Sequence, residues 1–450
     1  MIVRRKRYGL VLCLLPLLLI ALFLSLPVRP GTGPVRYLGT PLARDNITNN
    51  NKDINNNDYN ISDYNAINNY DISTDIWFYN VFNTADRNKG YRKLNSIANI
   101  TTTTESLRNS HSTSGFAVRI RSHSHIVIII SYMRSGSTLT GDIMQHFPGT
   151  FYVFEPFHAM EIRTKQNKHL VYLNGTKRSL TNATFSDRMA LQEELHKWLE
   201  CRLEELDVNS LADSFHQYYS ATMSKFSACW QAKHRIVRSL QECLPVAKEL
   251  CERAHFRLFK FIRLPMDVIE SVFESYPNLQ VIHLLRDPRA VLRSQVKVNA
   301  FTLEEIPPKA RAHCARISTD LSSTIRLYNK YPTRTRLLLY ERLAENPLDT
   351  SRKMFTFIGK PHDVTILDYV YNMTQAGHRS VGLDFGVLQV NSTRTAYLWR
   401  DELSYHTIQR IDSYCKGVYS YLGYQVFRSE RESRDHNFPT LLSPNISLIL

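Results

Sequence analysis

The chain has 450 residues and a formal net charge of +15, from 56 lysines and arginines against 41 aspartates and glutamates. A surface this basic attracts polyanions such as nucleic acid, anionic lipid or acidic glycan. The seven cysteines include no Cys-x-x-Cys pair, which argues against a zinc or dithiol redox site.

The N-terminus predicts a membrane anchor. Basic residues at 4–7 precede an apolar run over residues 9–28, which is long enough to cross a bilayer core at a helical rise of about 1.5 Å per residue. The basic residues favour a cytoplasmic tail, residues 1–8, with the rest of the chain in the lumen. A cleaved signal peptide is the alternative, but the run is long for one and no A-x-A-like site follows it.

Residues 29–122 predict a disordered luminal stem. Eleven asparagines fall within residues 46–69, and the apolar residues show no sustained period. A luminal setting excludes nucleic acid as the polyanion that the basic surface attracts. It also allows the six cysteines after the span to form three disulfides, for which 15 pairings are possible. Eight N-x-[ST] sequons fit that setting; they stand at Asn46, Asn60, Asn99, Asn174, Asn182, Asn372, Asn391 and Asn445.

The segment 126–139, IVIIISYMRSGSTL, predicts a buried strand, a tight loop and the start of a helix. Its five consecutive β-branched residues are typical of a strand buried on both faces of a parallel sheet. The small residues around Gly136 precede a helical spacing of apolar side chains, a turn that presents backbone N–H groups to a phosphate. Because GxxxxGK[ST] is absent and Arg134 precedes the small residues, the loop is P-loop-like without being an ordinary nucleotide-hydrolase loop. The alternative is a buried strand and a capped helix with no ligand.

The segment 281–294, VIHLLRDPRAVLRS, predicts a second strand that ends in arginines. Arg286 and Arg289 follow the strand directly, where open α/β sheets bind ligands. Asp287 is placed to cap the next helix, with Pro288 at its first position. The planar fork of arginine suits a phosphate monoester, and a solvated basic turn is the alternative.

Strands and helices alternate from residue 123 to 428. We predict strands at 126–130, 151–154, 257–262, 280–285 and 336–340, and amphipathic helices at 189–206 and 309–328. The predicted fold class is therefore α/β, a P-loop-like parallel sheet flanked by helices in one domain. Residues 429–450 are predicted to be a loose C-terminal tail.

Together the two motifs resemble the sulfotransferase superfamily, which transfers sulfuryl groups from 3′-phosphoadenosine-5′-phosphosulfate (PAPS). Arg134, where many cytosolic members carry lysine, and FYVFEPFH over residues 151–158 are similar to the Golgi carbohydrate 6-O-sulfotransferases. The resemblance covers about residues 124–427. It implies the sulfotransferase fold, PAPS as donor without a metal, a glycan acceptor, and a single-pass type II enzyme of the Golgi membrane. The oligomeric state stays open, a homodimer included.

The resemblance also implies which residues bind the donor. The first loop would hold the 5′-phosphosulfate, with Arg134 on the leaving-group side, and the second would hold the 3′-phosphate, chiefly through Arg286 and Ser294. Arg289 is the weaker candidate, because a surface position would suit it equally. The predicted donor-binding residues are Arg134, Ser135, Gly136, Ser137, Thr138, Leu139, Thr140, Arg286, Asp287, Pro288, Arg289 and Ser294.

A sugar hydroxyl is a poor nucleophile near neutral pH, so a general base within hydrogen-bond reach is expected. Glu155 is the predicted base, and the flanking aromatic residues are expected to desolvate it and raise its pKa. A structural ion pair with one of the arginines is the alternative for Glu155. His158 is the alternative base, and the favoured interpretation of it is a polar residue beside the cleft.

Other functions remain open at this stage. A type II glycosyltransferase shares the anchor and stem, but its metal-dependent members usually carry an Asp-x-Asp triplet, which is absent here. A catalytically inactive glycan-binding protein would be expected to lose Arg134, Arg286 or Glu155, and all three are present. A protein-tyrosine sulfotransferase shares donor and compartment but matches the carbohydrate-type segments less well.

The acceptor sugar is expected to be selected by the stretch between the motifs, roughly residues 160–255. Trp399 and Arg400, with Tyr397 nearby, are candidates for an aromatic and cationic wall of the acceptor site. Core packing is the alternative for Trp399.

Overall fold

The computed structural model describes residues 125–166, 168–179, 188–235, 237–361, 363–375, 391–442 and 447–450. The predicted cytoplasmic tail, membrane span and stem lie outside the described residues. Among the described residues, no helix is long and apolar enough to cross a bilayer. The described residues all belong to one compact unit.

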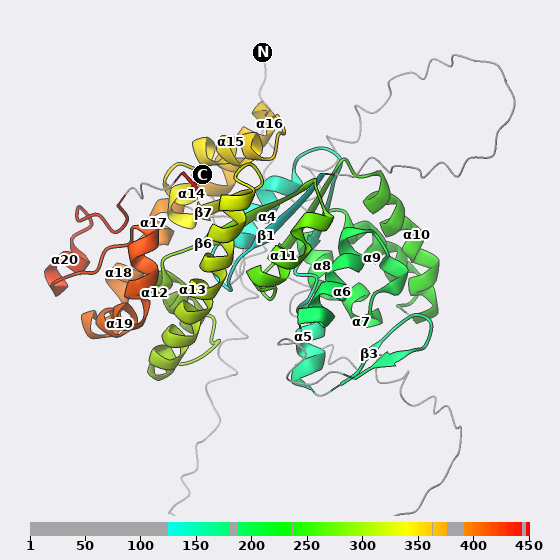
Figure 1. The fold of residues 1–450 in the computed structure, drawn as a ribbon, viewed down its shortest axis with the longest axis horizontal. Helices are drawn as coiled ribbons and strands as arrows, with labels where there is room; N and C mark the ends of the chain where they lie inside the picture. The colour runs from blue at the N-terminus through cyan, green and yellow to red at the C-terminus, as the bar shows by residue number, and fades with distance from the viewer. Residues whose placement is uncertain are drawn as a thin grey trace, which may run out of the picture. The chain divides into compact units, whose positions relative to one another are not determined.

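Seven strands and a larger number of helices make up the described part of the chain (Figure 1). The strands are β1 His125–Ile130, β2 Thr150–Phe154, β3 Leu170–Val171, β4 Lys177–Arg178, β5 Phe256–Phe261, β6 Leu279–Leu285 and β7 Thr335–Leu339. The helices before β6 are α4 Ser137–Gln145, α5 His158–Lys165, α6 Arg188–Leu199, η1 Leu203–Glu205, α7 Val208–Leu211, α8 Ser214–Tyr219, α9 Met223–Ala232, α10 Val237–Arg253, α11 Met266–Val272 and η2 Phe273–Ser275. Those after β6 are α12 Pro288–Lys297, η3 Leu303–Glu305, α13 Ile306–Lys330, α14 Tyr340–Glu345, α15 Pro347–Phe357, α16 Val364–Thr374, α17 Ser392–Tyr397, α18 Trp399–Glu402, α19 Tyr405–Leu422 and α20 Glu430–Arg434.

Five strands form one parallel sheet in the order β2-β5-β1-β6-β7, which confirms the α/β prediction. The β-branched residues of β1 explain its central place, because a strand with neighbours on both edges and helices on both faces must be apolar throughout. Residues 126–130 are each no more than 5% exposed. Alternate side chains of β1 enter two separate cores, with Ile128 on one face and Val127 on the other.

The helices cover the sheet unevenly (Figure 1). The segment from α5 to α10 gathers beside β2 and β5, whereas α12, α13, α18 and α19 gather beside β6 and β7. Disulfides join the helices within each group: Cys201–Cys251 and Cys229–Cys243 lie in the first, and Cys314–Cys415 connects α13 to α19 in the second. The three predicted disulfides therefore form, and the fold selects the pairing that the sequence left open.

The predicted helix over 189–206 is too long. Helix α6 ends at Leu199, and the backbone turns at Cys201, whose φ is +57°. A non-glycine residue in the left-handed region ends a helix, and the disulfide to Cys251 holds this corner. The predicted helix over 309–328 is confirmed as the longer α13.

The prediction of a loose tail after residue 428 is wrong for the described part of it. Arg400, 2% exposed, donates hydrogen bonds to the carbonyl oxygens of Ser433 and Phe438 and to the hydroxyl of Thr440. Ile449 forms a parallel bridge with Leu337 of β7. A buried guanidinium needs acceptors for its five donors, and the tail supplies them as backbone carbonyls.

Candidate active site

The carboxyl ends of the five parallel strands bring the predicted motifs to one edge of the sheet. Strand β1 leads into the first motif and its neighbour β6 leads into the second. On the other side of β1, strand β5 ends near Lys260 and Arg263, and β2 ends directly before Glu155. Ligands of open α/β sheets bind at this edge, next to the strand where the connections reverse direction.

The first loop is shaped by its backbone. Arg134 and Gly136 both have left-handed φ values, +72° and +90°, a conformation that costs a non-glycine residue roughly 1–2 kcal/mol. The Ser135 hydroxyl donates to the carbonyl of Tyr132 and accepts from its N–H, which closes the turn. Because the surroundings hold Arg134 in a strained conformation, this position is a functional-site candidate on local geometry as well as on sequence.

Helix α4 begins with backbone N–H groups directed toward this loop. Gly136 is its N-cap and provides no side-chain cap, so the first-turn N–H groups have no partner within the helix. A β-carbon on Gly136 would lie 2.2 Å from Cδ2 of Tyr340, so only glycine fits here. This geometry, unpartnered N–H groups at a helix N-terminus, is suited to an anion.

The predicted donor-binding residues of the first loop differ in whether their side chains are already hydrogen-bonded or packed within the fold. The Ser137 and Thr138 hydroxyls make no hydrogen bond with any residue that the structure describes. The Thr140 hydroxyl donates to the carbonyl of Gly136, and Leu139 packs in the core below the helix. Ser137 and Thr138 therefore remain donor-binding candidates by side chain, whereas Leu139 and Thr140 shape the loop.

The second motif divides into residues that face the first loop and residues that hold the fold. Asp287 caps α12 by accepting from the N–H of Arg289, and Pro288 occupies the first turn, as predicted. Arg289 has no exposed surface; its guanidinium pairs with Asp287 at 2.8 Å and with Asp412 at 3.5 Å. It also lies 4.3 Å from the centroid of the Trp399 ring. Arg289 is therefore a fully buried cation paired within the fold and not a surface residue, and Asp287 and Pro288 form the start of α12.

The two motifs are joined directly. Nε of Arg134 donates to the hydroxyl of Ser294 at 3.0 Å, and Nη1 of Arg286 donates to the carbonyl oxygen of Arg134 at 3.0 Å. Arg286 also donates to the carbonyl of Thr395, while its Nε is buried with no partner among the described residues. Residues 160 positions apart thus lie within hydrogen-bond distance at the junction of β1 and β6.

Glu155 is enclosed by two cations. Its carboxylate accepts from Nζ of Lys260 and from Nη1 of Arg263, and its side chain is only 8% exposed. Burial on its own raises the pKa of Glu155, but Lys260 and Arg263 outweigh that effect and hold the pKa below its ordinary value. The predicted upward shift is therefore wrong, and Glu155 is ion-paired here.

Lys260 is part of the same cluster, and the sequence prediction missed it. Burial lowers the pKa of its ammonium against the opposing effect of Glu155, and Nζ lies 3.8 Å from the centroid of the Phe154 ring. The available signal was a lysine near the carboxyl end of the aromatic-rich strand FRLFKF, which carries Arg257 at its start. Arg263, which also pairs with Glu161, carries no comparable pattern.

His158 lies beside this cluster at the start of α5. Its Nδ1 is 2.7 Å from Oδ2 of Asp213, which caps α8, and its ring centroid is 4.0 Å from that of Phe215. Asp213 falls within the stretch 160–255 that was expected to select the acceptor. The sequence alone did not indicate this contact.

The proposed acceptor wall is not formed in this structure. Trp399 is 1% exposed and Arg400 is enclosed by the C-terminal residues. The hydroxyl of Tyr397 donates to Glu345. Trp399 and Arg400 belong to the interior and Tyr397 is half-buried, which bears out the core-packing alternative for Trp399.

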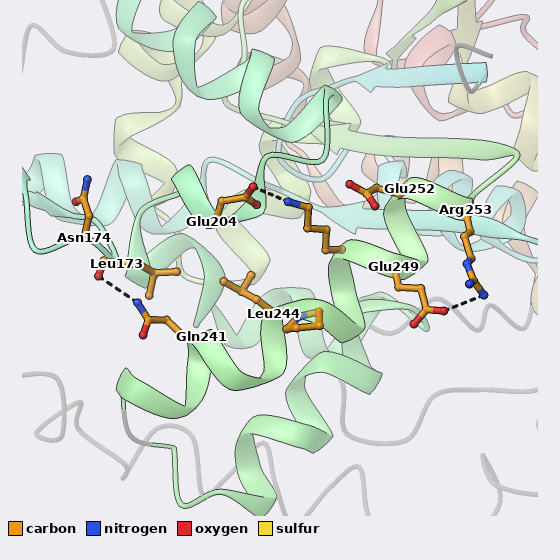
Figure 2. Close-up of a pocket in the computed structure, with 10 residues that line it drawn as sticks. Leu173, Asn174, Glu204, Gln241, Leu244, Glu249, Glu252 and Arg253 are labelled. Atoms are coloured by element: carbon orange, nitrogen blue, oxygen red, sulfur yellow. Dashed lines mark hydrogen bonds and ion pairs between the residues drawn. The ribbon is translucent and has the colours of Figure 1, made fainter. Parts of the chain in front are cut away.

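A large surface hollow lies elsewhere (Figure 2). It has a volume of about 720 Å³ and is lined by residues of the β3–β4 hairpin, η1 and α10. Gln241 of α10 reaches the carbonyl of Leu173 across it, at 3.4 Å. None of the predicted site residues lines this hollow. Among the described residues no group of three or more His, Cys, Asp or Glu side chains is arranged to hold a metal ion.

The fold is that of an α/β protein, with a tight loop and a helix N-terminus at the carboxyl edge of its parallel sheet. The sequence model of the Sulfotransferase family matches residues 127–363, a span that holds both motifs. The chain therefore belongs to the sulfotransferase family, whose reaction is sulfuryl transfer.

Carbohydrate sulfotransferases are among its similar proteins. Human carbohydrate sulfotransferase 1 is 26% identical over 372 residues, which cover 74% of this chain and 85% of that protein. Mouse carbohydrate sulfotransferase 5 is 24% identical over 345 residues, covering 70% and 85%.

Solved structures give more distant matches. The sulfotransferase domain from the olefin synthase of Synechococcus PCC 7002 has a TM-score of 0.35 at 17% identity, covering 65% of this chain and 96% of that one. Mouse sulfotransferase SULT7A1, solved with PAP, has a TM-score of 0.33 at 9% identity, covering 69% and 88%.

Proposed function

We propose that this protein transfers a sulfuryl group from PAPS to the 6-hydroxyl of a hexosamine or galactose residue in a glycan. The observation that carries the proposal is the direct junction of the two motifs, through Arg134 with Ser294 and Arg286 with the Arg134 carbonyl. A donor with phosphate groups at both ends needs cationic and N–H donors on two neighbouring turns. Family membership supplies the reaction class.

The residues present fit such a donor. The N–H groups at the start of α4 and the Ser137 and Thr138 hydroxyls would bind the 5′-phosphosulfate, with Arg134 beside them. Arg286 and Ser294 would bind the 3′-phosphate, because Nε of Arg286 has no partner among the described residues. Gly136 keeps the cradle open, since any side chain there would meet Tyr340.

The chemistry asked of the protein is alignment, charge stabilisation and removal of one proton. In this proposal Arg134 and the α4 N–H groups stabilise charge on the departing phosphate. Lys260 and Arg263 place two further positive charges at the same edge, on the β5 side. The proton of the acceptor hydroxyl passes to a group at the end of β2, where Glu155 and His158 lie.

The acceptor class rests on three supports. The similar proteins are carbohydrate sulfotransferases, and the net charge of +15 favours an anionic polymer. The basic and apolar N-terminal sequence with its sequons fits a single-pass type II protein of the Golgi membrane, with residues 123–428 in the lumen. These three points favour a glycan over a protein acceptor.

The test is sulfation by the purified full-length chain with radiolabelled PAPS. The acceptor panel holds keratan, chondroitin, N-acetylglucosamine-terminated glycans and a tyrosine peptide. We expect label on the 6-hydroxyl of one of the sugars, and none with Arg134→Ala. Exposed Arg352 provides the matched control, and Arg352→Ala is expected to retain full activity. Labelling of the tyrosine peptide alone, or of no acceptor, would overturn the proposal.

A further inference from the structure

We propose that His158, oriented by Asp213, accepts the proton of the acceptor hydroxyl, and that Glu155 serves as the counterion of Lys260 and Arg263. This inference rests on the proposed function and assigns the base within it. Asp213 is a positioning residue, because it acts through His158 and not on the reacting atoms.

The geometry around His158 is that of an oriented base. Nδ1 lies 2.7 Å from Oδ2 of Asp213, and the imidazole packs on the Phe215 ring. Because a carboxylate only accepts, Nδ1 carries the hydrogen, which leaves a lone pair on Nε2 in the neutral ring. Nε2 has no hydrogen-bond partner among the described residues, and the side chain is 15% exposed. A second group that fixes the tautomer of a histidine is the arrangement found in nucleophile-activating triads.

The charges around His158 favour this assignment. Burial would raise the pKa of Asp213, but the hydrogen bond from His158, the electrostatic effects of His216 and His158 and the hydrogen bond from the Phe215 N–H together hold it below its ordinary value. His216, the second histidine near Asp213, donates Nδ1–H to the carbonyl of Phe154, and burial lowers its pKa. His216 therefore stays neutral and Asp213 stays ionised. Glu155 is a further charged group that interacts electrostatically with His158.

Glu155 is poorly suited to accept the proton. Both carboxylate oxygens are engaged, one by Lys260 and the other by Arg263. A carboxylate whose pKa is held below its ordinary value is a weak base at neutral pH. To take up a proton it would have to leave the buried Lys260 without its counterion and weaken its pair with Arg263, which is strongly unfavourable.

The position of the pair fits the expected acceptor side of the site. His158 begins α5 at the carboxyl end of β2, on the same edge as the donor loop. Asp213 comes from the helical segment between the motifs. The segment expected to select the acceptor thus also orients the base.

The proton balance of the step is simple. The acceptor oxygen forms a bond to sulfur while the bond from sulfur to the bridging phosphate oxygen breaks, and the leaving phosphate keeps that electron pair. The hydroxyl proton moves to Nε2 of His158. The resulting imidazolium is stabilised by the Asp213 carboxylate and later releases the proton to water.

The first test compares His158→Gln with His169→Gln, an exposed histidine eleven residues further along the chain. With PAPS and the labelled acceptor, we expect kcat of the His158 variant to fall by about a hundredfold or more. Its affinity for PAP, measured by calorimetry, is expected to stay within about twofold of the unchanged protein. The His169 variant is expected to match the unchanged protein in both.

The second test uses Asp213→Asn and the pH dependence of kcat. A base that must be neutral produces an acid limb in the pH profile of kcat, and the position of that limb depends on the negative charge beside the base. The acid limb is therefore expected to shift to lower pH, together with about a tenfold loss of kcat. A merely structural role would lower expression or stability without moving the limb.

Two results would overturn the assignment. Near-normal kcat in a folded His158→Gln protein would exclude His158 as the base while leaving the proposed function intact. An unshifted acid limb in Asp213→Asn would exclude Asp213 as the positioning residue. This measurement still tests the His158–Asp213 assignment if the His158 variant does not fold. Failure of the unchanged protein to sulfate any acceptor is a separate result, which overturns the proposed function and the base assignment with it.

Discussion

The two sides of β1 differ in whether their positive groups already have an anionic partner. On the β6 side, the loop at Arg134 and the start of α4 present N–H groups and hydroxyls with no internal anion to receive them. On the β5 side, Glu155 is already neutralised by Lys260 and Arg263. The first region is arranged for an anion that comes from outside, and the second keeps its own counterion.

The difference explains why one edge of a sheet can serve two substrates. An orphaned helix N-terminus gains most when a polyanionic donor arrives. The cluster of Glu155, Lys260 and Arg263 is stable before any substrate binds, because its charges are already paired. In the proposed function, its two cations still lie beside the transferred group. The same distinction separates the binding arginines from Arg289, which is permanently neutralised inside the fold.

Gly136→Ala tests the donor side and has the largest expected effect on the use of PAPS. The new β-carbon would lie 2.2 Å from Tyr340, at a φ of +90°. We expect kcat/KM for PAPS to fall by about a hundredfold. Gly359→Ala is the matched control, because Gly359 also has a left-handed φ, +64°, but no atom within 4 Å of the added carbon. Equal losses in the two variants would show backbone strain alone and contradict a built cradle.

Arg289→Met tests the permanently neutralised arginine. The change leaves Asp287 and Asp412 without their cation, so the free energy of unfolding is expected to fall toward the upper end of about 3–5 kcal/mol. Urea denaturation measures it. PAP affinity of the folded protein is expected to stay within about threefold, because the guanidinium has no exposed surface. A specific loss of PAP binding without loss of stability would restore Arg289 as a donor ligand.

Glu155→Gln tests the paired cluster on the other side. It leaves Lys260 buried without its counterion, and we expect a destabilisation toward the lower end of about 3–5 kcal/mol, because Arg263 keeps Glu161. The double variant with Lys260→Met is expected to recover part of that loss in urea denaturation. Additive losses in the double-variant cycle would mean that the two side chains are not coupled.

Glu341→Gln gives the smallest expected effect. It tests the buried carboxyl group that accepts a hydrogen bond from the N–H of Asp287 in the second motif. Burial and then the charge of Asp287 raise the pKa of Glu341 to about 7. Since the folded pKa lies above the ordinary value of 4.5, the folded chain favours the protonated acid, and stability present below pH 4.5 is lost as pH rises toward 7. The loss is at most about 3 kcal/mol. Urea denaturation between pH 4.5 and 7.5 should show a smaller pH-dependent loss of unfolding free energy in the variant than in the unchanged protein. Equal pH slopes in the two proteins would contradict this role of Glu341.

Much of the fold followed from local patterns. The β-branched run of β1 and the apolar runs of the other sheet strands predicted all five within one residue, because buried parallel strands must be continuously apolar. Asp287 and Pro288 predicted the start of α12, since cap chemistry is local. The donor-loop candidates followed from the same kind of local reasoning.

What the sequence did not predict depends on which strands become neighbours. Glu155 and Lys260 are 105 positions apart, and they pair only because β2 lies beside β5. The upward pKa shift expected for Glu155 failed for that reason. The contact of Asp213 with His158 and the packing of the tail on Arg400 are equally non-local.

The most direct test of the central claim is a binding cycle that changes the ligand and the protein together. Calorimetry would compare PAP with adenosine 5′-phosphate, which lacks the 3′-phosphate, on the unchanged protein, Arg286→Ala and Arg134→Ala. If one nucleotide spans both motifs, loss of the 3′-phosphate weakens binding to the unchanged protein and to Arg134→Ala but hardly to Arg286→Ala. Equal weakening in all three proteins would contradict the shared site.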